Sequence, residues 1–129
     1  MDEIRPVPGA PLKVLIVDDE PSVLLMLERC LTEAGCVVRR AASAEAGIAI
    51  ARSEPLDVIL TDLCLPGMNG FEAIGAFRGE RGTPVLVMTG HNDSEFQKDA
   101  ICFGAVGLIE KPVDLIQLID SVRRAAGRP

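Results

Sequence analysis

Residues 13–21 read Lys-Val-Leu-Ile-Val-Asp-Asp-Glu-Pro, an apolar run that ends in acidic residues and a proline. The run is typical of a buried strand, and Pro21 is typical of the first turn of a helix. Three later apolar runs, at 58–61, 85–88 and 106–109, alternate with helical patterns. The alternation predicts a doubly wound α/β domain whose parallel sheet is covered on both faces.

Periodicity and turn residues predict five strands and five helices, with the strands in the order 2-1-3-4-5. The strands are expected at Lys13–Val17, Cys36–Ala41, Asp57–Thr61, Val85–Met88 and Val106–Ile109. The helices are expected from Pro21 to about Gly35, from Ser43 to before Pro55, from Phe71 to Phe77, from Asn92 or Asp93 through Phe103, and from Asp114 to Ala126. The first helix should turn one stripe toward the sheet, made of Val23, Leu27, Cys30, Leu31 and Ala34.

Chemically active residues lie where the apolar runs end. Asp18 and Asp19 follow the first run, Asp62 follows the second, and Thr89 and Lys111 follow the last two. Parallel sheets bind ligands beyond the carboxyl ends of their strands, so these side chains should meet at one edge. Crowded carboxylates repel one another unless a cation joins them, and an ammonium with a hydroxyl suits the oxygens of a phosphoryl group. The set predicts a Mg²⁺-dependent phosphoryl site built around one aspartate.

Five motifs together resemble the receiver domain of bacterial two-component response regulators, the CheY-like superfamily. They are Val-Asp-Asp-Glu-Pro (17–21), Thr-Asp-Leu-Cys-Leu-Pro-Gly-Met-Asn-Gly (61–70), Met-Thr-Gly (88–90), Gly-Ala (104–105) and Glu-Lys-Pro (110–112). Each motif alone is weak evidence, but five in the family's order are strong. The resemblance implies a flavodoxin-like receiver domain at 13–126, with an irregular lead-in at 1–12 and a tail at 127–129.

The resemblance also implies how the domain is phosphorylated. A sensor histidine kinase or a phosphotransfer protein would donate the phosphoryl group of a phosphohistidine to Asp62, the nucleophile. Asp19 would bind Mg²⁺ directly and Asp18 largely through water, and Asp62 and the Cys64 backbone carbonyl would complete the protein ligands. The domain would also catalyse its own dephosphorylation.

Two further residues complete the implied machinery. Lys111, which the family aims into the site through a cis bond to Pro112, would neutralise phosphoryl charge. Thr89 would offer its hydroxyl to a phosphoryl oxygen. Phosphorylation would then change a surface near the fourth helix, fifth strand and fifth helix, which a downstream target protein or a missing output domain would read.

Leu108 departs from the family, which commonly carries Tyr or Phe three residues before the lysine. The usual aromatic relay is therefore in question, and a packed strand residue is favoured over a smaller relay. Leu108 also motivates the alternative of a non-phosphorylated pseudo-receiver that only binds proteins. Cys64 and His91, each two residues beyond a site residue, should rim the pocket.

Two other phosphate-handling classes fit poorly. A haloacid-dehalogenase-like phosphatase needs an aspartate two residues after its nucleophile, and this chain has Cys64 there. A flavodoxin-like FMN module needs a hydroxyl- and glycine-rich loop after the first strand, whereas Asp18, Asp19 and Glu20 would repel phosphate.

Composition narrows the partners and the location. The chain of 129 residues and 13.7 kDa suits one domain, and its net charge of −6 argues against direct binding to nucleic acid. Four cysteines without a Cys-x-x-Cys pair favour reduced thiols, and no apolar stretch approaches a membrane span. We expect a cytoplasmic protein that avoids membranes, either a stand-alone regulator or a receiver cut from a larger chain.

Overall fold

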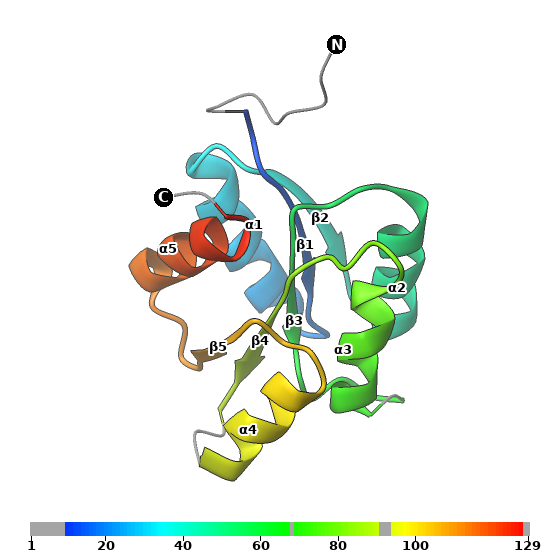
Figure 1. Cartoon of the computed structure of the whole chain (residues 1–129). Helices are drawn as coiled ribbons and strands as arrows, with labels where there is room; N and C mark the ends of the chain where they lie inside the picture. The colour runs from blue at the N-terminus through cyan, green and yellow to red at the C-terminus, as the bar shows by residue number, and fades with distance from the viewer. Residues whose placement is uncertain (1–9, 68, 91–93, 128–129) are drawn as a thin grey trace.

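The structure is a computed structural model that describes residues 10–67, 69–90 and 94–127 (Figure 1). Its five strands are parallel and lie in the order β2-β1-β3-β4-β5, so the expected topology is confirmed. The elements in chain order are β1 (Lys13–Val17), α1 (Pro21–Glu33), β2 (Val37–Ala41), α2 (Ala44–Ser53), β3 (Val58–Asp62), α3 (Gly70–Arg78), β4 (Val85–Thr89), α4 (Ser94–Cys102), β5 (Gly107–Glu110) and α5 (Leu115–Ala125).

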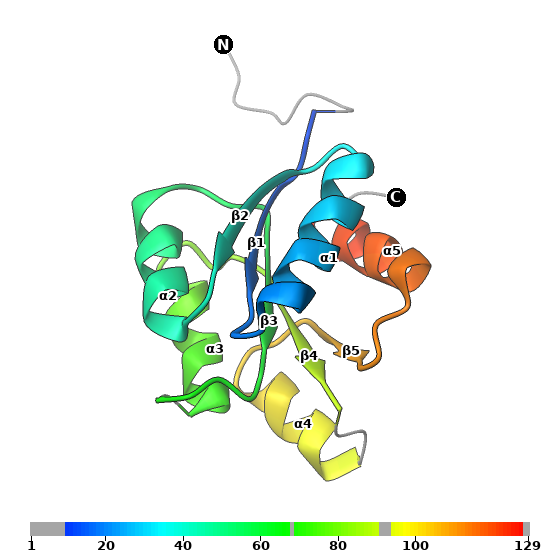
Figure 2. The same cartoon turned by 180° about the vertical axis from the view of Figure 1, so that it is seen from behind.

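The helices form two layers around the sheet, as Figures 1 and 2 show from opposite sides. Alternate residues of β1 pack against the two helix layers in turn, because successive side chains of a strand point to opposite faces of the sheet. Val14 and Ile16 pack in one core with α1 and α5, and Leu15 and Val17 pack in another with α2, α3 and α4. Burial on both faces explains why the central strands are apolar without interruption.

Side-chain caps fix where three helices begin. Ser43 accepts a hydrogen bond from the Ala46 amide at the start of α2, and Asp114 accepts from two amides of α5. Both caps were expected from sequence. Asn69 caps α3 in the same way, which sequence analysis did not anticipate. The expected cap of α4 at Asn92 or Asp93 lies outside the described residues.

One packing expectation was incomplete and one was wrong. In α1, Leu27 and Leu31 of the expected stripe are buried, and Val23 and Cys30 pack against the same core while partly buried, but the buried Leu24 was not expected. Phe103 follows α4 instead of ending it and is 48% exposed. Within the described residues, no helix is both long and apolar enough to span a bilayer.

Candidate functional site

Backbone hydrogen bonds continue the sheet beyond the strand ends and position the residues of the site. The Asp18 amide donates to the Ala41 carbonyl at 3.2 Å, and the Leu63 amide, next to Asp62, donates to the Met88 carbonyl at 3.2 Å. The Lys111 amide donates to the Thr89 carbonyl at 2.9 Å. Backbone hydrogen bonds to a neighbouring strand therefore help to fix where each of these side chains starts, independently of the contacts that the side chains make.

Three carboxylates meet at this edge of the sheet. One carboxylate oxygen from each of Asp18, Asp19 and Asp62 lies within 4.8 Å of the others. Asp18 is fully buried and Asp62 is nearly so, whereas Asp19 is exposed. The sequence prediction that these residues meet is correct, and burial further distinguishes two interior carboxylates from one that faces solvent.

Lys111 joins the two buried carboxylates. Its Nζ lies 3.1 Å from Asp62 Oδ2 and 3.4 Å from Asp18 Oδ2, and its peptide bond to Pro112 is cis, as the family resemblance implied. Partial burial alone lowers the pKa of Lys111, but the hydrogen bond to Asp62 and the charges of Asp62 and Asp18 raise it above its ordinary value. The ammonium therefore stays charged beside the cluster.

Backbone amides hold the second oxygen of each buried carboxylate. Asp18 Oδ1 accepts from the Glu20 amide at 2.9 Å, and Asp62 Oδ1 accepts from the Cys64 amide at 3.1 Å. Both oxygens of both carboxylates are thus hydrogen-bonded, which fixes their rotation. Cys64 itself is exposed at the rim of the site.

The remaining predicted residues come from the β4–β5 side. Thr89 is buried at the last position of β4, beside Glu110 in the parallel register. Leu108 is half-buried and packs against the core under α2, α3 and α4, in agreement with the favoured reading of a packed strand residue. His91 lies outside the described residues.

Gly70 is a supporting residue that sequence analysis quoted only as part of a motif. A Cβ at this position would overlap the carbonyl oxygen of Leu63, so only glycine lets α3 begin this close to the backbone that follows Asp62. The Asn-Gly pair at 69–70 was a usable signal, since asparagine is a preferred helix cap.

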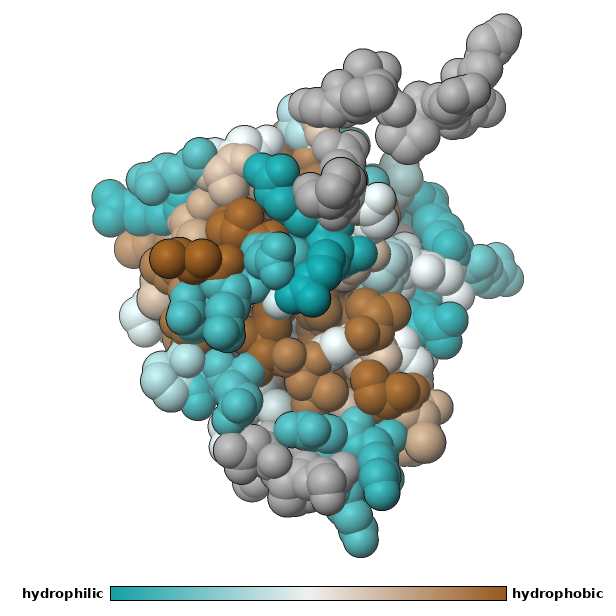
Figure 3. All heavy atoms as spheres, turned by 60° about the vertical axis from the view of Figure 1, so that its left-hand side comes forward, coloured by the Kyte–Doolittle hydropathy of each residue, from teal (hydrophilic) through white to brown (hydrophobic). Residues whose placement is uncertain are grey.

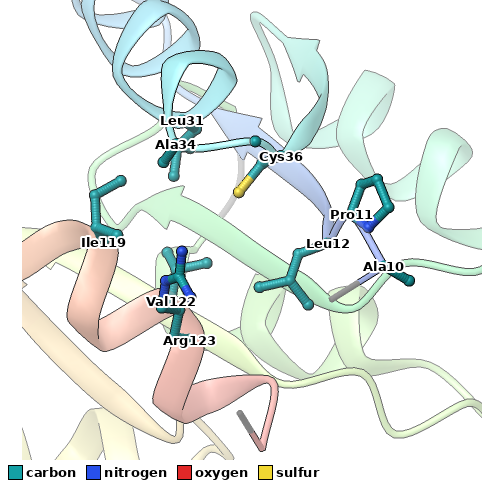
Figure 4. Close-up of a pocket in the computed structure, with 10 residues that line it drawn as sticks. Ala10, Pro11, Leu12, Leu31, Ala34, Cys36, Ile119, Val122 and Arg123 are labelled. Atoms are coloured by element: carbon teal, nitrogen blue, oxygen red, sulfur yellow. The ribbon is translucent and has the colours of Figure 1, made fainter. Parts of the chain in front are cut away.

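The cavity in Figure 4 lies away from this site. It encloses about 230 Å³ between the end of α1, the start of β1 and α5. Its lining is mainly aliphatic, with the Arg123 side chain among it. No carboxylate of the acidic cluster lines it, and the site instead lies open at the strand ends.

The acidic cluster suits a Mg²⁺ ion. Its donors are carboxylate oxygens, which hard divalent cations prefer. Among the described residues, the one cationic group paired with these three carboxylates is Lys111, which contacts Asp18 and Asp62. The excess negative charge of this arrangement is what a bound cation would neutralise. The residues present therefore fit the ion that the family resemblance implied.

Comparisons with known proteins agree with this geometry. The family model for the response regulator receiver domain matches residues 14–123. The transcriptional regulatory protein KdpE of Mycobacterium tuberculosis is 34% identical over 89% of this chain and 51% of its own length, and FixJ of Rhizobium meliloti is 38% identical over 88% and 56%. The solved structure of the chemotaxis response regulator CheY4 of Vibrio cholerae matches with a TM-score of 0.83 and 33% identity, over 89% of this chain and 98% of that one.

The chain spans about half the length of these two curated relatives. The matched region nevertheless covers the whole described sheet except Lys13, and it includes the acidic cluster and Lys111. On the family match, the fold and the identity to curated relatives, this chain belongs to the response regulator receiver domain family.

Proposed function

We propose that residues 13–126 form a phosphorylatable receiver that takes a phosphoryl group from the phosphohistidine of a histidine kinase onto Asp62. The observation that carries the proposal is the placement of Asp62. Its carboxylate is buried at a strand end, held by the Cys64 amide and by Lys111, and within 4.8 Å of two more carboxylates. A loop-capping aspartate would also accept from the Cys64 amide, but it would need neither Lys111 nor the two neighbouring carboxylates.

The transfer follows from the positions of the protein's own groups. An oxygen of Asp62 attacks phosphorus, the P–N bond to the donor histidine breaks, and the imidazole leaves with the bonding electron pair. Lys111 stands beside Asp62 and pairs with the oxygens of the transferring group, and the Thr89 hydroxyl donates to one of them. Catalysis is then mostly positioning and charge stabilisation.

Asp18, Asp19, Asp62 and the backbone carbonyl of Cys64 would hold Mg²⁺. When bound, this ion neutralises carboxylate and phosphoryl oxygens that would otherwise repel one another. Lys111 supplies one positive charge to Asp18 and Asp62, and the exposed carboxylate of Asp19 lies where an ion can enter from solvent.

An apolar surface beside the site suits the docking of a phosphodonor protein. Leu25, Met26, Leu115 and Ile116 are large exposed hydrophobic residues near the starts of α1 and α5, and both helices begin just after site residues. Ile116 is 84% exposed. Hydrophobic side chains lie open on the face that Figure 3 shows, and exposed apolar patches of this kind mark interaction sites. The donor's histidine must approach this same edge, so the two features support each other.

The alternative of a pseudo-receiver rests on Leu108 alone. A packed leucine argues against the usual aromatic relay but leaves Asp62, Lys111 and the acidic cluster together. With either function, the output would be a protein-interaction surface that a downstream target or an output domain reads. A cytoplasmic location would suit the four free cysteines, because thiols stay reduced there.

One experiment separates the two functions. The protein is treated with acetyl phosphate and Mg²⁺ and its intact mass is measured. A phosphorylatable receiver gains one phosphoryl group, loses the gain when the cation is chelated, and gains nothing as Asp62→Asn. An unchanged mass for the unaltered protein under these conditions would support the pseudo-receiver, and persisting modification of Asp62→Asn would move the nucleophile elsewhere.

A further inference from the structure

Three arginines gather at the edge of the molecule opposite the acidic cluster. Arg52 lies in the last turn of α2, Arg78 ends α3, and Arg81 lies in the loop that follows α3. The carboxyl ends of α2 and α3 lie at the upper right in Figure 1, where the two helices run side by side. The strand ends that carry Asp18 and Asp62 point the other way.

These three arginines make no ion pair among the described residues. Three arginines elsewhere form ion pairs, namely Arg39 with Glu54, Arg40 with Glu28 and Arg124 with Asp120. In the part of the chain that the structure describes, no carboxylate lies within ion-pair distance of Arg52, Arg78 or Arg81. Although the net charge of the chain is −6, three arginines thus lie close together at one edge without an ion-pair partner among the described residues.

All three arginines line a single groove of about 590 Å³. Small residues Ala51, Gly75 and Ala76 contribute to its lining, and a Cβ added at Gly75 would meet nothing within 4 Å. Glu80 is the one acidic residue among the lining residues, so arginines outnumber acids three to one. The groove therefore combines space beside small residues with Arg52 and Arg81, whereas the guanidinium of Arg78 lies against Gly104, which does not line the groove.

The helix dipole explains only part of this arrangement. A cation in the last turn complements the partial negative charge of a helix end, which accounts for Arg52 and Arg78. Arg81 lies outside any helix and gains nothing from this effect. Neither helix end explains why Arg81 lines the same groove as Arg52.

We propose that this groove binds an acidic segment of a partner protein. Guanidinium groups bind carboxylates with two parallel hydrogen bonds, and the small lining residues leave room for the segment's backbone. A short segment would touch only the basic groove. A long nucleic acid would also meet the acidic remainder of the surface, which would repel it. The inference concerns a second site and does not depend on phosphorylation of Asp62.

The probe is an acetylated, amidated Glu-Glu-Ala-Ala-Glu-Glu peptide, and the matching Gln-Gln-Ala-Ala-Gln-Gln peptide is its uncharged control. Both are titrated into the ¹⁵N-labelled protein at low salt while backbone amide shifts are followed. The acidic peptide should produce saturable shifts at 51–52 and 75–81 that weaken as salt is added. Shifts that are absent, spread over the whole surface, or equal for the two peptides would overturn the proposal.

Matched variants test which charges act. The double variant Arg52→Gln/Arg81→Gln should weaken binding by about tenfold, since each exposed charge pair contributes modestly. Arg78 is left unchanged because its side chain packs where a Cβ of Gly104 would lie. Arg123→Gln removes an arginine from a different cavity and should change nothing. Equal weakening by Arg123→Gln would show that net charge, and not the groove, controls binding. If a short DNA duplex shifted the same amides and bound more tightly than the acidic peptide, the ligand of the groove would be nucleic acid and the proposal would be wrong.

Discussion

The two halves of the carboxyl edge of the sheet are built differently. On the β1–β3 side, Asp18 and Asp62 are buried, each accepts a backbone amide, and both share Lys111. Toward β5, Leu108 is only half-buried and Glu110 is exposed. The carboxylates of the first half are fixed by burial and hydrogen bonds, whereas side chains of the second half are more exposed and less restricted by packing. We therefore expect ion binding to depend on the first half and signal output on the second, with Thr89 on β4 contributing to both phosphoryl transfer and output.

The largest expected effect is on ion binding by the acidic half. Asp19→Ala removes the exposed carboxylate of the cluster and should lower Mg²⁺ affinity by roughly ten- to a hundredfold, because one of three charged ligands is lost. The chain has no Trp or Tyr, so amide shifts during a Mg²⁺ titration are the suitable readout. Asp120→Ala makes the same charge change on α5, away from the cluster, and should leave affinity unchanged. Equal affinities for the two variants would remove Asp19 from the site.

The next effect concerns the packing that keeps this half rigid. Gly70→Ala places a methyl group against the Leu63 carbonyl and should lower the free energy of unfolding by about 2 kcal/mol, the typical cost of overpacking. Gly75→Ala lies in the same helix with open space around it and should raise that free energy by about 0.5–1 kcal/mol. Urea denaturation followed by circular dichroism measures both. A neutral Gly70→Ala would mean that the start of α3 can move away from the loop without cost.

The positions of the site residues on both halves were the most predictable feature of the molecule. Asp18, Asp62, Thr89 and Lys111 lie at the ends of apolar runs, and in a parallel sheet all such ends share one edge. The parallel direction of the strands therefore brings these four residues to the same edge. No periodicity was needed beyond the recognition of four short strands.

Features that depend on close packing were less accessible from sequence. In α1, positions 23–27 are all apolar, so the pattern could not fix which face is buried. The structure buries Leu24 and Leu27 and leaves Leu25 more than half exposed. The approach of Gly70 to Leu63 and the shared groove of Arg52 and Arg81 likewise join residues whose spacing carries no periodic signal.

A smaller effect is expected at the rim of the site. Hydrolysis of an aspartyl phosphate needs a water in line behind phosphorus, and the exposed side chain of Cys64 is a weak hydrogen-bonding group. Cys64→Asn should speed phosphoryl loss by up to about tenfold, if one hydrogen bond to that water contributes roughly 1 kcal/mol. Decay is followed at fixed Mg²⁺ and pH in both proteins. We expect His91 to matter more than Cys64, but equal or slower loss from Cys64→Asn would show that position 64 does not control water access.

The smallest expected effect is at Leu108, in the half that should carry the output. Its side chain packs against the core under α2, α3 and α4, and a branched aliphatic chain cannot take the alternative buried and exposed ring positions of Tyr or Phe. Phosphorylation should therefore act through Thr89 on α4 and its preceding loop, with little change in the rotamers of residue 108. Methyl NMR with and without phosphodonor and Mg²⁺ measures those rotamers directly. A large rotamer switch that disappears in Thr89→Ala would show that Leu108 is itself the relay. The β4–β5 half would then transmit phosphorylation through the side chain of Leu108.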